Sequence, residues 1–171
     1  MTNIRSLFHI QVRGALDIAE PVIRTLWPDP PPLTLEIVRR DAIQRIVAPW
    51  GSSLAWDTAV RKCRHIPRSC FIGVQRGQTV SIVALMRVSD SGLHTSLLFL
   101  GKDTDAVPRG LAMTIMDQVL DFVASSFQSA RIVLDNPLSG LVSYYKDFGY
   151  EELRRHGGRE SPALFRPVGV R

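Results

Sequence analysis

The stretch that decides the fold is Leu141-Val142-Ser143-Tyr144-Tyr145-Lys146-Asp147-Phe148-Gly149-Tyr150-Glu151. We expect residues 138–148 to form a short helix, because Gly149 follows it and glycine is common directly after the last helical residue. Residues 150–155 then predict a strand. Tyr144 and Tyr145 are neighbours on the helix and point about 100° apart. The stretch therefore predicts a helix, a glycine turn and a strand, with a tyrosine on each of two helix faces.

A second glycine turn lies upstream, at Val107-Pro108-Arg109-Gly110-Leu111-Ala112. It precedes the longest predicted helix, residues 110–127, whose apolar residues recur at helical spacing as a wide buried stripe. Phosphate groups bind well at such a point, because free backbone N–H groups and the positive end of the helix dipole point outward and glycine allows a close approach. A glycine near the N-cap of an ordinary strand-to-helix turn gives the same pattern, so both interpretations stay open.

Around these two turns, five segments have the length and apolar pattern of strands: residues 70–75, 79–88, 94–100, 131–134 and 163–166. The first two are joined at Arg76-Gly77, a hairpin turn that tolerates positive φ. Asp90-Ser91-Gly92 makes the next turn. The second strand alternates most clearly, and its apolar face is predicted to carry Val80, Ile82, Ala84, Met86 and Val88.

The N-terminal part of the chain predicts one strand followed by three helices. Residues 7–12 alternate weakly and suit the strand, and residues 15–26 have apolar side chains on one helical face. The proline-rich residues 28–32 form an extended connection. Thr34 then caps a helix that continues past Ile46, and a further helix ends near Arg64. The predicted order is β-α-α-α-β-β-β-α-β-α-β-β, an α+β arrangement with one central mixed sheet.

The composition is that of one ordinary globular domain: 171 residues, 45% apolar and 22% charged. No apolar run approaches the ~18–20 residues of a membrane helix, and residues 1–5 lead into no apolar signal segment. We therefore expect a cytoplasmic protein with no membrane partner. Cys63 and Cys70 lack the spacing of a zinc site, and we expect them to be reduced, buried thiols without a metal.

The formal net charge is +5, from 21 basic and 16 acidic residues. A surface of this sign favours polyanionic ligands such as coenzyme A, nucleotides or RNA. Many of the arginines fall between residues 39 and 68, where a solvated helix face explains them. No named nucleic-acid-binding motif is present, so a nucleic-acid partner is not expected.

The element order and the two glycine turns together resemble the GNAT superfamily of N-acetyltransferases. The resemblance covers about residues 6–167 and is strongest over residues 70–152. It implies an α+β fold in a single domain, with a GNAT-like central mixed, mostly antiparallel sheet flanked by helices. It also implies that residues 28–68 form a variable helical segment, and that residues 70–155 form the acyl-CoA-binding core.

The family pattern for the diphosphate-binding turn is Q/R-x-x-G-x-G/A. Gly110 and Ala112 match it, whereas Val107 stands where the family has Gln or Arg. Arg109, beside the glycine, is a residue type common there in the family and is able to pair with phosphate. The resemblance thus assigns Val107, Arg109, Gly110, Leu111 and Ala112 to the binding of acetyl-CoA or another acyl-CoA as co-substrate.

Three other residues are assigned to the cofactor by the resemblance. In the family, the strand before the diphosphate loop parts from its neighbour and offers backbone groups to the pantetheine arm, which implies that role for Phe99 and Leu100. Asn136 follows the fifth strand, where the family frequently has an asparagine that contacts the cofactor. From the residues alone, Phe99 and Leu100 are core-strand positions, and Asn136 is part of a turn that caps a helix.

The resemblance also points to the catalytic groups. Family members often have Tyr-x-x-x-Gly-Phe, and Tyr145 has this spacing to Gly149, with Tyr150 in place of Phe. A phenol near the thioester is able to protonate the departing thiolate, so Tyr145 is predicted as general acid; a half-buried packing role is the alternative. His94 is a candidate general base with an ordinary pKa of about 6.5, or simply an exposed histidine at a strand end.

These observations predict an acetyl-CoA-dependent N-acyltransferase that moves an acyl group to a primary amine by direct attack. The acceptor is expected to be a small-molecule or peptide amine, and a homodimer is left open. The tryptophans Trp27, Trp50 and Trp56 either form an acceptor pocket or cover the sheet, and we favour cover. The alternatives are a GNAT-like module that binds acyl-CoA or a protein without turnover, and an enzyme that modifies charged tRNA.

Overall fold

The structure is a computed structural model that describes residues 3–137, 139–152 and 163–169. Within these residues, seven strands form one sheet in the order β1-β2-β3-β4-β5-β7-β6. Their bounds are β1 Leu33–Val38, β2 Ser69–Arg76, β3 Thr79–Val88, β4 His94–Lys102, β5 Arg131–Asp135, β6 Glu151–Glu152 and β7 Ala163–Pro167. Only the β4–β5 pair is parallel in the described part of the sheet. The predicted mixed, mostly antiparallel sheet in a single α+β domain is confirmed.

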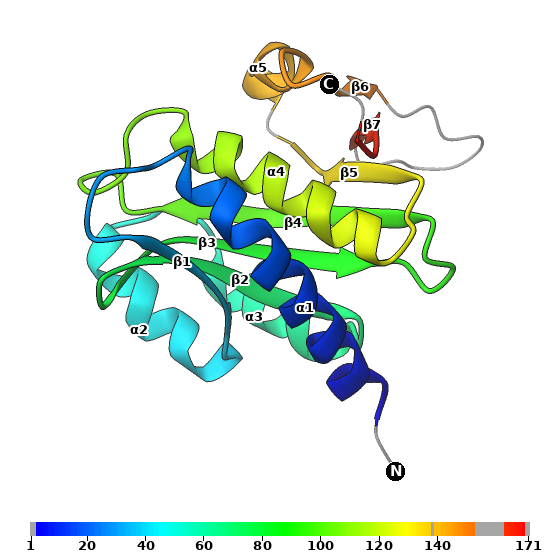
Figure 1. The fold of residues 1–171 in the computed structure, drawn as a ribbon, viewed down its shortest axis with the longest axis horizontal. Coiled ribbons are helices and arrows are strands. Elements are labelled where there is room, and N and C mark those ends of the chain that lie inside the picture. The colour runs from blue at the N-terminus through cyan, green and yellow to red at the C-terminus, as the bar shows by residue number, and fades with distance from the viewer. Residues whose placement is uncertain (1–2, 138, 153–162, 170–171) are drawn as a thin grey trace.

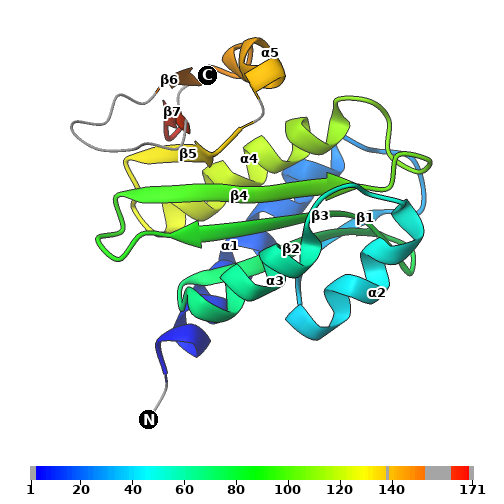
Figure 2. The ribbon, with the colours of Figure 1, turned by 180° about the vertical axis from the view of Figure 1, so that it is seen from behind.

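Helices cover both faces of the sheet. The α-helices are α1 Ile4–Arg24, α2 Ile43–Val47, α3 Trp56–His65, α4 Leu111–Ser126 and α5 Val142–Lys146, and three short 3-10 turns are η1 Arg40–Ala42, η2 Ala48–Trp50 and η3 Ser139–Leu141. Helices α1 and α4 lie side by side on one face (Figure 1), and α2 and α3 lie on the other (Figure 2). Two apolar cores result, the larger under α1 and α4 and the smaller under α2 and α3.

The predicted first strand at residues 7–12 is wrong, because these residues belong to α1. Asn3 caps this helix by accepting a 2.8 Å hydrogen bond from the backbone N–H of Ser6. Six residues recur at helical spacing and are buried against the sheet and α4: Phe8, Val12, Ala15, Leu16, Ala19 and Ile23. Over six residues, weak alternation does not distinguish a strand from one side of such a helix.

The predicted helix that starts at Thr34 is also wrong. Residues Leu33–Val38 form β1, which pairs antiparallel with β2, and helical turns begin only at Arg40. Leu33 and Leu35 are buried on one face of the sheet, as the period of two in a strand requires. The segment 28–68 is therefore not purely helical, and its role as a variable segment stays a prediction.

The predicted hairpin of β2 and β3 is confirmed, but one of its residues faces the other side of the sheet. Strands β2 and β3 are joined at Gly77, which has a positive φ of 63°. Val80 was predicted on the same face as Ile82, but it packs on the smaller core under α2 and α3. The register shifts between Val74 and Gln75, so Ser81 is an extra residue and reverses the alternation.

Strand β4 leaves its parallel neighbour halfway along its length. Pairing with β5 runs from His94 to Leu97, whereas β4 continues to Lys102. A bulge lies at the same point, because Leu85 pairs with Phe99 while Met86 pairs with Leu97. Strand β5 ends at Asp135, one residue past the last pair, and the chain leaves β4 there, so an opening forms between the second half of β4 and the end of β5.

The elements around this opening largely follow the prediction. The long helix α4 begins at Leu111 with Gly110 at its N-cap, and the strands β5 and β7 lie where they were expected. Helix α5 is shorter than predicted, and residues 153–155 of the last predicted helix–strand unit lie outside the described residues. No helix in the described part of the chain is both long and apolar enough to cross a membrane.

Candidate functional site

Two adjoining cavities follow the opening between β4 and β5, and together we call them the central trough. One cavity lies at the start of α4, and the other lies between the ends of β4 and β5 and helix α3. Three residues line both: Leu100 from β4, Leu141 from the turn before α5, and Tyr145 from α5. The trough therefore brings together the two glycine-turn regions that the sequence marked as functional.

The start of α4 forms one end of the central trough. Gly110 has a positive φ of 82°, which glycine adopts without strain, and a Cβ built there would approach the Tyr144 hydroxyl to 3.7 Å. The backbone N–H groups of the first helical turn have no intrahelical acceptor. The Arg109 side chain is exposed beside them and forms no ion pair with the described residues. These features fit a negatively charged phosphate group.

Tyr145 lies in the middle of the central trough. Its side chain is half-buried, and burial, followed by the neighbouring Tyr144, raises the pKa of its phenol. The two tyrosine rings are 5.5 Å apart, and Tyr144 donates a long 3.4 Å hydrogen bond to the backbone oxygen of Gly110. Tyr145 is therefore a protonated phenol in the trough, whereas Tyr144 packs against the start of α4.

A buried charged cluster fixes the end of the segment that carries Tyr145. The Tyr150 hydroxyl donates a 2.7 Å hydrogen bond to Oδ1 of Asp117 on α4. Arg166 on β7 is fully buried and donates to the same oxygen at 2.9 Å and to Asp121 at 3.0 Å. The sequence analysis did not predict this cluster. The signal for it is the pair of aspartates, Asp117 and Asp121, within the apolar stripe of α4.

The other residues assigned to the cofactor are distributed differently. Phe99 and Leu100 line the central trough, as does Asn136, which has a positive φ of 50°. Leu111 lies at a further hollow beside Arg109 and Gly110, and Ala112 lines the trough itself. Val107 does not line the trough: it is 3% exposed and packs in the larger core.

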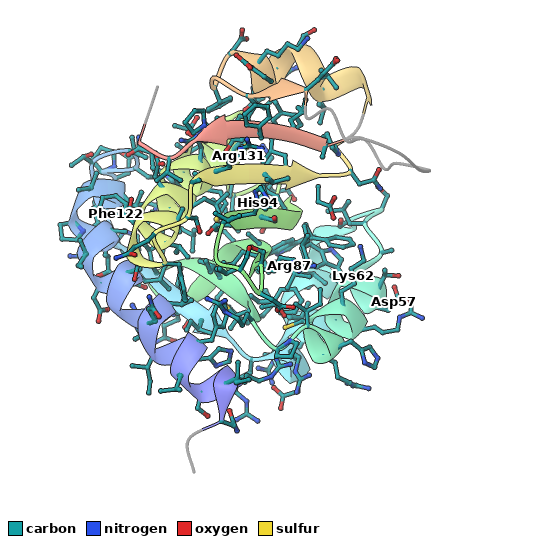
Figure 3. All side chains as sticks on the ribbon, turned by 90° about the vertical axis from the view of Figure 1, so that its right-hand side faces the viewer. Asp57, Lys62, Arg87, His94, Phe122 and Arg131 are labelled. Carbon is teal, nitrogen blue, oxygen red and sulfur yellow. The ribbon has the colours of Figure 1, made fainter. Side chains whose placement is uncertain are left out.

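His94 is not brought to Tyr145. It lies at the start of β4 and lines a hollow that adjoins the trough. Figure 3 shows it between Arg131 of β5 and Arg87 of β3. A carboxylate that sequence reasoning overlooked does reach the central trough. Asp135, at the end of β5, lines both the trough and the hollow that holds His94.

The predicted covering role of the tryptophans is confirmed for two of them. Trp27 and Trp56 are 5% and 4% exposed, so their rings pack inside the protein. Cys63 and Cys70 are free and buried thiols, as expected. Among the described residues, no group of three His, Cys, Asp or Glu side chains is placed to hold a metal ion.

No protein-family model matches the chain, and no curated protein matches it by sequence. Solved structures do match the chain, by their fold. The ribosomal-protein-S18-alanine N-acetyltransferase from Escherichia coli superposes with a TM-score of 0.58 at 14% identity, over 81% of this chain and 96% of that chain. An acetyltransferase of the GNAT family from Staphylococcus aureus gives 0.56 at 11% identity, over 80% and 99%.

The N-acetylglutamate synthase from Neisseria gonorrhoeae, solved with coenzyme A and N-acetyl-glutamate, gives a TM-score of 0.56 at 12% identity. This match covers 81% of the present chain and 35% of that chain. Identities this low relate folds and do not transfer an activity. The strand order, the β4–β5 divergence and these superpositions agree: the chain has the fold of the GNAT N-acetyltransferases.

Proposed function

We propose that this protein is an acyl-CoA-dependent N-acyltransferase that acts on a primary amine. The observation that carries the proposal is the central trough, which opens where β4 and β5 diverge and has Gly110 at one end and Tyr145 in its middle. The coenzyme A complex of the structurally similar synthase supports acyl-CoA as the co-substrate. Acetyl-CoA is the acyl donor that we would test first.

The chain offers separate groups for each part of an acyl-CoA. The first turn of α4, with Gly110 and Arg109, fits the diphosphate. The edge of β4 beyond Leu97, which β5 no longer pairs, presents backbone N–H and C=O groups to the pantetheine arm. Leu100 and Leu141 supply apolar walls near Tyr145.

The reaction needs an amine nucleophile and a proton for the thiolate. The amine nitrogen attacks the thioester carbonyl carbon, a C–N bond forms, and the C–S bond breaks with its electron pair moving to sulfur. The phenol of Tyr145 gives its proton to that sulfur, and its raised pKa keeps the phenol protonated at neutral pH. The Asp135 carboxylate lines the same trough, and we assign it the role of accepting the proton that the amine loses.

The first experiment is a thermal melt with and without acetyl-CoA, with ATP as the polyanion control. At a ligand concentration of about 100 times Kd, binding stabilises a protein by roughly 2.7 kcal/mol, which corresponds to a Tm rise of about 5–10 °C for a domain of this size. A rise with acetyl-CoA and not with ATP supports the co-substrate site. An unchanged Tm at millimolar acetyl-CoA contradicts it.

The catalytic step is tested with Tyr145→Phe, and Tyr144→Phe is the matched control. Loss of a general acid lowers kcat by about 10²–10⁴-fold, while the Tm rise with acetyl-CoA should remain. Tyr144→Phe should retain most of its turnover, because its hydroxyl only donates a long hydrogen bond to Gly110. Equal turnover in the two variants would exclude Tyr145 as the acid.

The second candidate function is a module that binds acyl-CoA without turnover. One observation favours it: Val107, in place of the family's Gln or Arg, is buried and gives no polar side chain to the diphosphate. Such a module would show the Tm rise with acetyl-CoA and no transfer to any amine. A cytoplasmic location stays a prediction.

A further inference from the structure

A basic hollow adjoins the central trough on strands β3, β4 and β5. Its charged lining comes from three neighbouring strands: Arg87 of β3, His94 of β4, and Arg131 and Asp135 of β5. Figure 3 shows Arg87, His94 and Arg131 one after another across the sheet. The hollow shares Leu98 and Asp135 with the central trough, so a molecule in it reaches the trough beside Tyr145.

Charge is ordered along this basic hollow. Asp135 lies at the junction with the trough, and Arg131 lies four residues earlier on the same face of β5, about 13 Å away along the strand. Arg87 is two strands away, on β3, and it pairs with Ser96, which is level with Val133, midway between Arg131 and Asp135 along β5. Within the hollow, the carboxylate of Asp135 therefore lies at the junction with the trough, and Arg131 lies farthest from it along β5.

Neither of the two arginines forms an ion pair with an acidic side chain in the part of the chain that the structure describes. Arg87 is half-buried and makes no ion pair with the described residues. Arg131 places its guanidinium 5.0 Å from the Phe165 ring, which leaves its N–H groups directed to other acceptors. A guanidinium that has no carboxylate partner on its sheet face is able to bind the carboxylate or phosphate of a ligand. It does so through two parallel hydrogen bonds.

We propose that the acceptor is an anionic amine, whose ammonium group binds at Asp135 and whose carboxylate or phosphate binds at Arg87 and Arg131. This inference rests on the proposed acyltransferase function, because Asp135 orients the amine toward the thioester. It goes beyond that function by naming the acceptor class. Simple alkylamines and diamines lack the group that the arginines recognise.

The test compares amines of one chain length that differ only at the far end: hexylamine, 6-aminohexanoate, 6-aminohexyl phosphate and 1,6-diaminohexane. Transfer from acetyl-CoA and direct calorimetric binding are both measured. The carboxylate or the phosphate compound should exceed hexylamine by about tenfold to a hundredfold in kcat/KM or in affinity, as expected for a charge-assisted hydrogen bond. The better of these two identifies the anion.

Arg87→Gln and Arg131→Gln should remove this preference and leave the rate with hexylamine unchanged. Arg45→Gln, an exposed arginine of α2 away from the hollow, is the control and should change neither. Equal use of hexylamine and the anionic amines, or an unaltered preference in both variants, overturns the proposal. If no amine is acetylated, calorimetry still decides it, because selective binding of the anionic amine supports the site while the transferase function fails.

A separate surface carries a second inference. Helix α1 has an exposed apolar stripe on the side away from the sheet: Ile4, Leu7, Ile10, Ile18 and Val22, exposed by 64%, 56%, 67%, 69% and 43%. Figure 1 shows α1 crossing the front of the molecule, and no other helix or strand of the described residues lies over it. A monomer rarely exposes so many large apolar side chains along one helix.

The stripe has a two-fold pattern about Gly14. Ile10 and Ile18 lie four residues on either side of it, about 6 Å along the helix, and Leu7 and Val22 lie seven and eight residues away. A Cβ at Gly14 would meet nothing within 4 Å, so the centre of the stripe is open to a second helix.

Charges beside the stripe match the same pattern. Arg13 and Asp17 flank it and form an ion pair at 2.8 Å within α1. If two copies of α1 pack antiparallel across Gly14, Arg13 of each copy faces Ala15 of the other and lies two residues, about 3 Å along the helix axis, from the position opposite Asp17, a distance that an arginine side chain spans. We infer that α1 binds a second copy of this chain in this way, as a two-fold antiparallel helix pair.

Light scattering after gel filtration tests this inference at micromolar protein. The wild type should have twice the mass of the chain, and Ile18→Asp should have the mass of one chain. Gly14→Leu is the discriminating variant, because it leaves the monomer unstrained and yet blocks a close helix crossing. It should also be monomeric, with unchanged helix content. A monomeric wild type, or a dimeric Gly14→Leu protein, overturns the inference.

Discussion

Replacement of Tyr150 by Phe isolates one hydrogen bond of the buried cluster that ties α4 to the end of α5. The Tyr150 side chain is 1% exposed, and its hydroxyl donates to Oδ1 of Asp117 at 2.7 Å. The phenylalanine keeps the ring and its packing. Asp117 loses one donor and keeps Arg166, whose Nε lies 2.9 Å away. The loss of stability in this variant therefore measures one charge-assisted hydrogen bond, because removal of a hydroxyl leaves almost no cavity.

Hydrogen bonds to charged groups contribute roughly 1.5–3 kcal/mol, so Tyr150→Phe should lower the free energy of unfolding by that amount. In a domain of this size, each 1 kcal/mol lowers Tm by about 2–4 °C, which gives a fall of about 3–12 °C. Urea unfolding at pH 7 and a thermal melt measure both quantities. Tyr144→Phe is the control, because its 3.4 Å hydrogen bond at a half-exposed site should contribute less than about 0.5 kcal/mol.

The cluster also predicts a pH dependence. Burial, followed by the Asp117 carboxylate, raises the pKa of Tyr150 far above the ordinary value of about 10. As pH rises past about 10, the unfolded chain ionises this tyrosine while the folded protein does not, so stability falls with increasing pH. Tyr150→Phe should weaken this alkaline loss. A stability loss below about 0.5 kcal/mol at pH 7, equal to that of Tyr144→Phe, would show that Arg166 alone satisfies Asp117.

Three other changes test separate parts of the molecule. Gly101→Ala should cost about 1–3 kcal/mol in urea unfolding, because its Cβ would overlap the buried Trp56 ring, whereas Gly14→Ala has open space and should not destabilise. Burial lowers the pKa of His9, so as pH falls through about 6.5 the unfolded chain binds a proton before the folded protein does. The Tm of the wild type should therefore fall between about pH 7.5 and pH 5.5, and the Tm of His9→Gln should fall less. Arg109→Gln should weaken acetyl-CoA binding about twofold to fivefold at low salt, and the difference should shrink in high salt.

The elements with strong local signals could be predicted from the sequence. The hairpin of β2 and β3 has clear alternation and a glycine at its turn, and α4 has a wide apolar stripe. Both patterns extend over ten or more residues in β3 and α4, enough to separate a period of two from a period of 3.6. Gly110 lies at the N-cap of α4, so this end of the candidate site could be located from the sequence.

The N-terminal elements could not be predicted in the same way. Residues 7–12 alternate over one and a half helical turns only, and their burial is decided by α4, which lies about a hundred residues farther along the chain. Residues Leu33–Val38 are a strand because β2 is beside them, a partner that local propensity does not contain. Thr34 is a strand residue for the same reason, although threonine is also a good helix cap.

The candidate base His94 and Tyr145 line different cavities for a topological reason. The sequence analysis named His94 as the candidate base, and the structure places it at the start of β4. Strand β5 runs parallel to β4, so the ends of both strands point the same way, and Asp135 at the end of β5 arrives beside the second half of β4. His94 starts β4 and is thereby held at the opposite end. The parallel pair thus brings Asp135, forty-one positions after His94 in the chain, to the trough that Tyr145 lines, and this makes Asp135 the better candidate to accept the amine proton.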